Sequence, residues 1–220
     1  MSIVFDENVD LFCLVTANTC YMIGLADHRT FVAQLYYGRR VRGQDLRYLL
    51  RTGEAPFVPS ENERERCSFY DTFPSEYSGN GVGDYRESSI AVRTQAGQHA
   101  VMPTYVSYEI TDQKPELPGL PSAFDRENTA QTLILHCRHE VLQLDVDLYY
   151  TVFEENDMIT RSVRICNHSK EAVYLTKAYS ACLDMDDDGY EMLTLHGSWG
   201  RARQMDRRPL GYGKTSVGSI

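Results

Sequence analysis

An alternation of apolar and more polar residues between positions 142 and 152 constrains the fold of this chain more than any other feature. The apolar positions are Leu142, Leu144, Val146, Leu148, Tyr150 and Val152, and Gln143, Asp145, Asp147, Tyr149 and Thr151 stand between them. A side-chain period of two is typical of a β-strand that buries one face in a core. An amphipathic helix would instead repeat its apolar residues every three or four positions. The segment therefore predicts a half-buried strand.

Further strand-like segments, rich in β-branched and aromatic residues, lie on both sides of this one. They cover residues 11–16, 20–26, 31–37, 88–93, 132–137, 159–165, 172–183 and 190–195. Short polar turns separate most of them, which favours consecutive antiparallel strands over 131–153 and 158–197. One short helix is expected at 44–50, where Leu46, Leu49 and Leu50 share a face. We predict an all-β chain that folds as one antiparallel β-sandwich domain over residues 1–220.

Composition narrows the classes of function. A hydrophobic fraction of 42% and a charged fraction of 24% are ordinary for a globular protein. The net charge of −9 argues against a surface that follows nucleic-acid phosphates. No apolar run reaches 18 residues and no basic-then-apolar leader opens the chain, so we expect neither a membrane span nor secretion. The six cysteines form no Cys-x-x-Cys pair, and we expect reduced, buried thiols in a cytoplasmic protein.

Residues 76–87, Glu-Tyr-Ser-Gly-Asn-Gly-Val-Gly-Asp-Tyr-Arg-Glu, place glycines at three alternate positions, 79, 81 and 83. Glycine tolerates positive φ and close backbone approach, so this run predicts a chain path that wraps a surface or receives another segment. A phosphate-binding loop would need a helix after the glycines and a Lys-Ser or Lys-Thr pair. The segment that follows is strand-like and the pair is absent, so we do not expect a nucleotide site.

The chain resembles glycoside hydrolase family 36, the bacterial α-galactosidases, and the similarity covers nearly all of it, from about Val4 to Ser219. The motifs that carry the resemblance stand in register at residues 76–86, 114–121, 132–133, 148–153, 159–162, 180–184 and 195–203. The resemblance implies the N-terminal β-sandwich (supersandwich-like) domain of a retaining enzyme that hydrolyses terminal α-galactosides such as melibiose and raffinose. In that family further strands and a (β/α)8 barrel follow, so the sandwich is expected to be incomplete at the C-terminal end.

The resemblance also implies where the chemistry lies. Family members carry their catalytic aspartates on the barrel, one of them in a Lys-Trp-Asp motif. The single tryptophan of this chain, Trp199, follows Ser198 instead. We therefore expect no catalytic residue, no cofactor and no metal in this chain. Its partners would be a galactoside, bound through the missing barrel, and further copies of the enzyme in a homo-oligomer.

Two interface or binding candidates follow. Trp199 is flanked by small residues and by Arg201 and Arg203, and Trp and Arg are enriched at the centres of protein interfaces. We expect these three side chains to dock against the barrel or a neighbouring subunit. Family members usually carry an acid where this chain has Ala202, so an ion pair expected there is missing.

Glu54 is the second candidate. In tetrameric family members a loop of this domain reaches the mouth of a neighbour's active site, and residues 51–57 match that loop best. A carboxylate on such an arm could hydrogen-bond sugar hydroxyls. An ordinary exposed glutamate is the alternative.

Other polar clusters favour structural interpretations. Residues 184–189 begin like a calcium loop, but the twelfth position is Leu195 rather than glutamate, so an acidic turn is favoured. His136 and His139 would point to opposite faces of a strand because their spacing is odd. The carboxylate pairs, such as Asp145 with Asp147, alternate with core residues or lie in turns, and solvent-facing charge is favoured over glycosidase chemistry.

Two alternative functions outside the enzyme class stay open. A stand-alone carbohydrate-binding sandwich would show exposed aromatic residues on one face, and the 15 tyrosines allow this. A structural oligomerisation module would have no affinity for sugar but a mass that depends on concentration.

Overall fold

The computed structural model describes residues 2–41, 46–50, 70, 72–185 and 188–218 of the 220-residue chain. The contacts divide the chain into two compact units, Met1–Asp184 and Met185–Ile220. The prediction of a single domain over 1–220 stays a prediction.

The first sheet of the larger unit is an antiparallel meander of four strands. Its strands, in spatial order, are β1 (Ile3–Asp6), β2 (Leu11–Val15), β3 (Thr19–Ala26) and β4 (Phe31–Arg39). β3 lies in the interior of the sheet and is buried on both faces, with Tyr21 and Ile23 in one apolar cluster and Cys20 and Met22 in another. A strand covered on both faces reads as a continuous apolar run rather than as an alternation, which explains the sequence of β3.

The second sheet of this unit is another four-stranded antiparallel meander. It consists of β6 (Thr104–Thr111), β7 (Gln131–His139), β8 (Leu144–Phe153) and β9 (Met158–Asn167). The period-two prediction is confirmed in β8, where Leu144, Val146 and Leu148 are buried while Asp145 and Asp147 are half-buried. Leu142 lies in the preceding turn, and Gln143 has a positive φ of 51° that no regular strand residue adopts.

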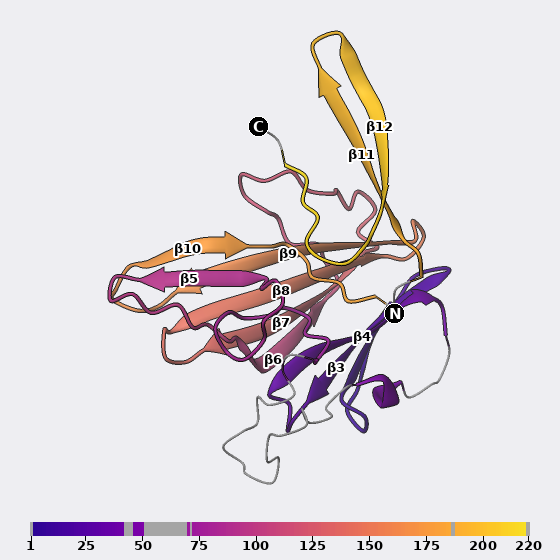
Figure 1. Cartoon of the computed structure of the whole chain (residues 1–220). Coiled ribbons are helices and arrows are strands. Elements are labelled where there is room, and N and C mark those ends of the chain that lie inside the picture. Colours follow the sequence, from indigo (N-terminus) through magenta and orange to yellow (C-terminus); the bar gives the residue numbers. More distant parts are fainter. Residues whose placement is uncertain (1, 42–45, 51–69, 71, 186–187, 219–220) are drawn as a thin grey trace. The chain divides into compact units, whose positions relative to one another are not determined.

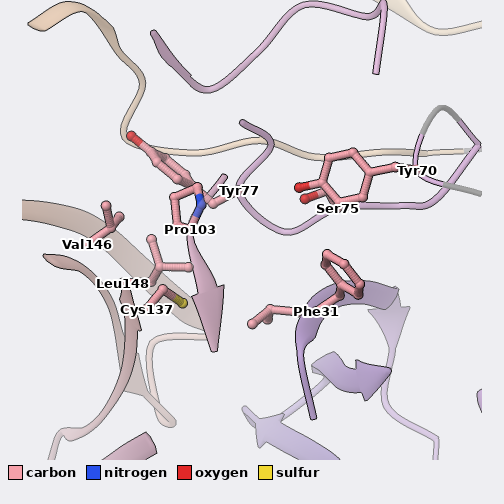
Figure 2. A pocket seen from close by; sticks show the side chains of 9 residues that line it. Phe31, Tyr70, Ser75, Tyr77, Pro103, Cys137, Val146 and Leu148 are labelled. Carbon is pink, nitrogen blue, oxygen red and sulfur yellow. The ribbon is translucent and has the colours of Figure 1, made fainter. Parts of the chain in front are cut away.

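The main core lies between these two sheets (Figure 1). Phe12, Leu14 and Ile23 from the first sheet pack in one cluster with Leu135 and Tyr150 from the second. The cavity shown in Figure 2, between Phe31 on one side and Leu148 on the other, measures only about 10 Å³. That is about the space one water molecule needs, so this cavity cannot hold a substrate.

Two smaller strand pairs complete the described elements. β5 (Ile90–Thr94) pairs antiparallel with β10 (Val173–Ala178), and β11 (Glu191–Ser198) pairs with β12 (Arg201–Pro209) in the smaller unit. A single turn of 3-10 helix, η1, covers Arg47–Leu49. Among the residues placed by the structure, no helix is long and apolar enough to cross a membrane.

The all-β antiparallel prediction is confirmed, but the expected strand order is wrong in places. Residues 158–197 do not form one run of neighbouring strands, because β10 pairs with β5 and β11 with β12. β1, β6 and β12 were not predicted. Arg and Gln interrupt the alternation in β12, whereas β6 does carry Val106, Tyr108 and Ile110 at alternate positions and was overlooked. The predicted strand at 172–183 ends at Ala178, and the helix expected at 44–50 is a 3-10 turn in its described part.

Candidate functional site

A buried carboxylate, Glu76, joins the two sheets. Its side chain is fully buried. The Tyr21 hydroxyl of β3 donates to Glu76 Oε2 at 2.7 Å, and the Tyr150 hydroxyl of β8 donates to Oε1 at 2.7 Å. Arg161 of β9 places Nη2 2.7 Å from the same Oε1 and stacks its guanidinium 4.9 Å from the centre of the Tyr150 ring. One side chain from the glycine-rich segment therefore binds strands of both sheets.

The electrostatics of this cluster follow from burial and charge. Burial raises the pKa of the Glu76 carboxyl, while the charge of Arg161 and the hydroxyls of Tyr21 and Tyr150 act to lower it. The pKa of each of these tyrosines is raised well above 10, by burial first and then by the nearby carboxylate. Both phenols therefore remain protonated donors. Every polar group around Glu76 is engaged in the fold, which is the arrangement of a structural anchor.

Arg86 forms a second anchor in the same glycine-rich segment. Its Nε and Nη2 make a two-point contact with Asp84 at 2.9 Å each. Nη2 also donates to the Phe73 carbonyl at 2.6 Å, and Nη1 lies 3.2 Å from Asp184 Oδ2. The planar guanidinium suits such a multiple contact. Because the Asp84 side chain is only 2% exposed, this carboxylate serves the fold rather than a ligand.

Both anchors hold residues 179–184, the last stretch of the larger unit. Arg161 Nη1 donates to the Cys182 carbonyl at 3.0 Å, and the Tyr77 hydroxyl donates to the Tyr179 carbonyl at 3.0 Å. Gln34 of β4 exchanges two hydrogen bonds with the backbone of Asp184, at 2.8 and 3.0 Å. Tyr179 N–H donates to the Ser89 carbonyl at 2.9 Å, and the side chains named above bind the carbonyls of Tyr179 and Cys182 and both backbone groups of Asp184.

The glycines of residues 76–87 receive another segment, as their sequence predicts. Asn80 and Val101 exchange two backbone hydrogen bonds of 2.9 Å. A Cβ on the neighbouring Gly79 would lie 2.0 Å from the Val101 carbonyl oxygen. Gly81 has a φ of +74°. Gly83 has a φ of +94°. Close approach at Gly79 and positive φ at Gly81 and Gly83 explain all three glycines without a phosphate ligand.

Trp199 lies at the tip of the β11–β12 hairpin. It forms the two-residue turn with Gly200, whose φ is +70°, and Ser198 pairs with Arg201 across it. The Trp199 side chain is completely exposed within the described residues, and Arg201 and Arg203 are exposed as well. The structure thus places the three predicted interface residues together at one end of a hairpin. Their contact with a partner stays a prediction.

The same hairpin exposes an apolar face that the sequence analysis did not identify. Leu195 and Met205 are cross-strand partners, and Leu193 lies two residues before Leu195 on the same face. Their exposed fractions are 65%, 70% and 54%. The signal for this face was the alternation of leucines with Thr194 and His196, but its partner strand was not predicted.

The remaining candidates from the sequence are Glu54 and the acidic turn at residues 184–189. Glu54, Asp186 and Asp187 lie outside the described residues. Asp184 is held by Arg86 and Gln34, and the part of the chain that the structure describes contains no group of three His, Cys, Asp or Glu residues arranged to bind a metal ion.

The two histidines of β7 are engaged in different contacts. His136 hydrogen-bonds Asp147 at 2.7 Å, whereas His139 contacts the backbone of Met102. The five described cysteines are free, but only Cys20 and Cys137 are fully buried, so the expectation of buried thiols is wrong for Cys13, Cys166 and Cys182, which are half-buried.

Comparison with known proteins shows which family this chain belongs to. Residues 30–220 match the glycosyl hydrolase family 36 N-terminal domain. The chain belongs to this family. It is 35% identical over 221 residues to the bifunctional alpha-galactosidase/sucrose kinase AgaSK of Mediterraneibacter gnavus, and this alignment covers all of the chain and 23% of that protein.

Solved structures of family 36 enzymes have the same fold. The alpha-galactosidase of Lactobacillus brevis superposes with a TM-score of 0.89 at 31% identity, over 99% of this chain and 29% of that one. A variant of AgaA from Geobacillus stearothermophilus, solved in complex with raffinose, gives a TM-score of 0.83 at 30% identity, over 92% of this chain and 28% of that one. The chain therefore spans about a quarter of the length of these family 36 proteins.

The comparisons and the geometry agree on the role of residues 76–87. Residues 76–86 are one of the motifs that carry the resemblance to family 36, and in the structure this segment supplies Glu76, Asp84 and Arg86 to the two anchors. Sequence reasoning missed Tyr21, Gln34, Tyr150 and Arg161, the partners of these anchors. Each lies on a strand, and no local pattern distinguishes a buried polar partner from a solvent-facing residue.

Proposed function

We propose that this chain is the non-catalytic N-terminal domain of a retaining α-galactosidase, which hydrolyses terminal α-galactosyl residues of galacto-oligosaccharides such as melibiose and raffinose. The observation that carries the proposal is the match over the whole chain to family 36 galactosidases that are about four times as long. Retaining hydrolysis needs two carboxyl groups about 5–5.5 Å apart across a substrate cleft. The buried acids Glu76 and Asp84 are instead bound to arginines of the fold.

The role of this domain in the enzyme is to support the catalytic portion and the assembly of subunits. The hairpin supports this role, because a two-stranded ribbon with Leu193, Leu195 and Met205 exposed on one face is marginal in water on its own. Covering that face would remove apolar surface from water at about 25 cal/mol per Å². Trp199, with Arg201 and Arg203, would form the centre of the contact.

The experiment that tests the proposal starts from the coding DNA downstream of Ile220. The expected result is a continuing reading frame that encodes a Lys-Trp-Asp motif and whose complete product releases galactose from raffinose. A stop codon directly after Ile220, or a complete product without activity on α-galactosides, would overturn the proposal. The stereochemistry of the released galactose, followed by proton NMR, tests retention separately.

A further inference from the structure

A cavity of about 200 Å³ lies between residues 114–123 and the outer face of strands β8 and β9. Its floor consists of two cross-strand pairs, Tyr149 with Ser162 and Thr151 with Thr160. These residues alternate with Leu148, Tyr150 and Val152, whose side chains are buried in the core on the opposite face of the sheet. The cavity is therefore built on a rigid sheet, and residues of the 112–130 connection close it.

Polar groups in this cavity are available for a ligand. The hydroxyls of Ser122, Thr160 and Ser162 make no hydrogen bond to any other residue that the structure describes. Lys114 uses one of its three donors, for the carbonyl of Pro115 at 3.3 Å. Among the residues that the structure places, no carboxylate lines the cavity. The lining thus offers hydroxyls that can both donate and accept, beside Lys114 and the guanidinium of Arg161, whose charge is paired with Glu76. Its described residues present nothing that favours a positively charged ligand.

Apolar surfaces complete the lining. Pro115, Leu117 and Pro121 contribute aliphatic walls, and Tyr149 contributes an aromatic ring. Hydroxyl-binding groups next to aliphatic and aromatic walls match the two kinds of surface that a sugar ring presents, its hydroxyl edge and its C–H face.

The volume of this cavity limits the size of the ligand that it can hold. Pockets for drug-sized molecules span about 300–1,000 Å³, which is more than this cavity offers. A single sugar ring is therefore the appropriate size, whereas an oligosaccharide would extend beyond the cavity.

We propose that this cavity binds one neutral monosaccharide unit and is a sugar-binding site carried by the β-domain itself. The choice of galactose and melibiose as probes rests on the proposed function. By ligand-efficiency arguments a ligand of this size binds in the range of ~1–10 mM. Such weak binding becomes relevant where a sugar is held close to the domain at high local concentration.

The test is a titration of the 220-residue chain with galactose and with melibiose, followed by saturation-transfer and ¹H–¹⁵N NMR. The expected result is saturable binding of both sugars, with shifts that map to β8, β9 and residues 114–123. Ser162→Phe, which fills the cavity, should weaken binding at least ten-fold. Ser107→Phe is the matched control, because Ser107 is an exposed serine on β6 of the same sheet, away from the cavity. It should bind like the wild type.

If Ser162→Phe fails to fold, Thr160→Val and Lys114→Met test the sugar site in its place. Each removes one polar group with little change in volume and should weaken binding about three-fold or more. Three outcomes would contradict the proposed sugar site. They are the absence of saturable sugar binding, equal binding by the wild type and the cavity variants, and tighter binding of inorganic phosphate at the same residues. None of these outcomes affects the proposed function, which depends on the downstream reading frame and on the activity of the complete product.

Discussion

At the scale of single residues, the fold depends on a carboxylate in a place where carboxylates are rare. A buried charge is tolerated only when it is paired and hydrogen-bonded, and Glu76 has Arg161, Tyr21 and Tyr150 as partners. Replacing such a cluster with apolar side chains is often neutral, whereas removing one partner leaves a buried group without compensation. The cluster is therefore expected to respond strongly to single substitutions.

Glu76→Gln tests this expectation. The amide keeps the shape of the side chain but removes the charge opposite Arg161, and we expect the free energy of unfolding to fall by about 3 kcal/mol. Urea denaturation at neutral pH measures the change. Glu171→Gln, at an exposed glutamate, is the matched control and should stay within about 0.5 kcal/mol of the wild type. Equal stability of the two variants would show that the Glu76 carboxylate contributes no net anchoring.

Gly79→Ala tests the close approach of two backbone segments. A Cβ at this position would lie 2.0 Å from the Val101 carbonyl oxygen, so the Asn80–Val101 bridge must separate. We expect a loss of about 3 kcal/mol, at the upper end of overpacking costs. Gly211→Ala, where a Cβ meets no atom within 4 Å, should be nearly neutral in the same denaturation experiment. A wild-type midpoint for Gly79→Ala would contradict the packing described here.

At the scale of elements, loops at the ends of the two sheets are tied by one side chain. Asp157 lies in the turn between β8 and β9 and accepts hydrogen bonds from Thr16 and from the backbone and side chain of Asn18. These bonds lower the pKa of Asp157 from 3.8 to about 2. The tie joins the β2–β3 loop to the β8–β9 turn, two elements that are distant in sequence.

Asp157→Asn tests this tie through its dependence on pH. The folded-state pKa lies below the unfolded one, so the carboxylate stabilises the fold above about pH 4, and this contribution is lost as the pH falls towards 2. Asparagine keeps one of the two acceptor oxygens and tolerates the positive φ of 54° but does not titrate. The stability advantage of the wild type should be largest near pH 6 and shrink below pH 4, measured by urea denaturation at each pH. An advantage that is independent of pH would contradict the assignment.

The sequence predicts elements better than their pairing. β8 could be read directly, because one of its faces is in a core and its period of two survives in the residues. β12, by contrast, has exposed residues along most of its length, so no alternation marks it. The pairing of β10 with β5 joins residues about 80 positions apart, and no local pattern encodes that choice. The glycine-rich segment was recognised, but its partners Tyr21 and Arg161 depend on the three-dimensional arrangement.

At the scale of the whole molecule, the hairpin is the element whose role reaches beyond this chain. The single tryptophan, at its tip, reports directly on whether it is covered. In the dilute 220-residue chain Trp199 should emit like a solvent-exposed indole and be fully open to acrylamide quenching. In the complete enzyme it should emit at shorter wavelength and be protected, because the proposed contact removes it from water. Exposed Trp199 in the assembled enzyme would contradict its assignment as an interface residue.

An activity assay of the 220-residue chain on p-nitrophenyl α-galactoside tests whether the β-domain is non-catalytic. Retaining hydrolysis needs two opposed carboxyl groups on a rigid scaffold, and a misplacement of about 1 Å can cost 10²-fold in rate. The buried acids of this chain, Glu76 and Asp84, hold the sandwich together instead. We expect no release of nitrophenol above the rate of a Glu54→Ala control or of buffer. Turnover that survives repurification and follows the protein peak would contradict it, because the active site would then lie within the β-domain.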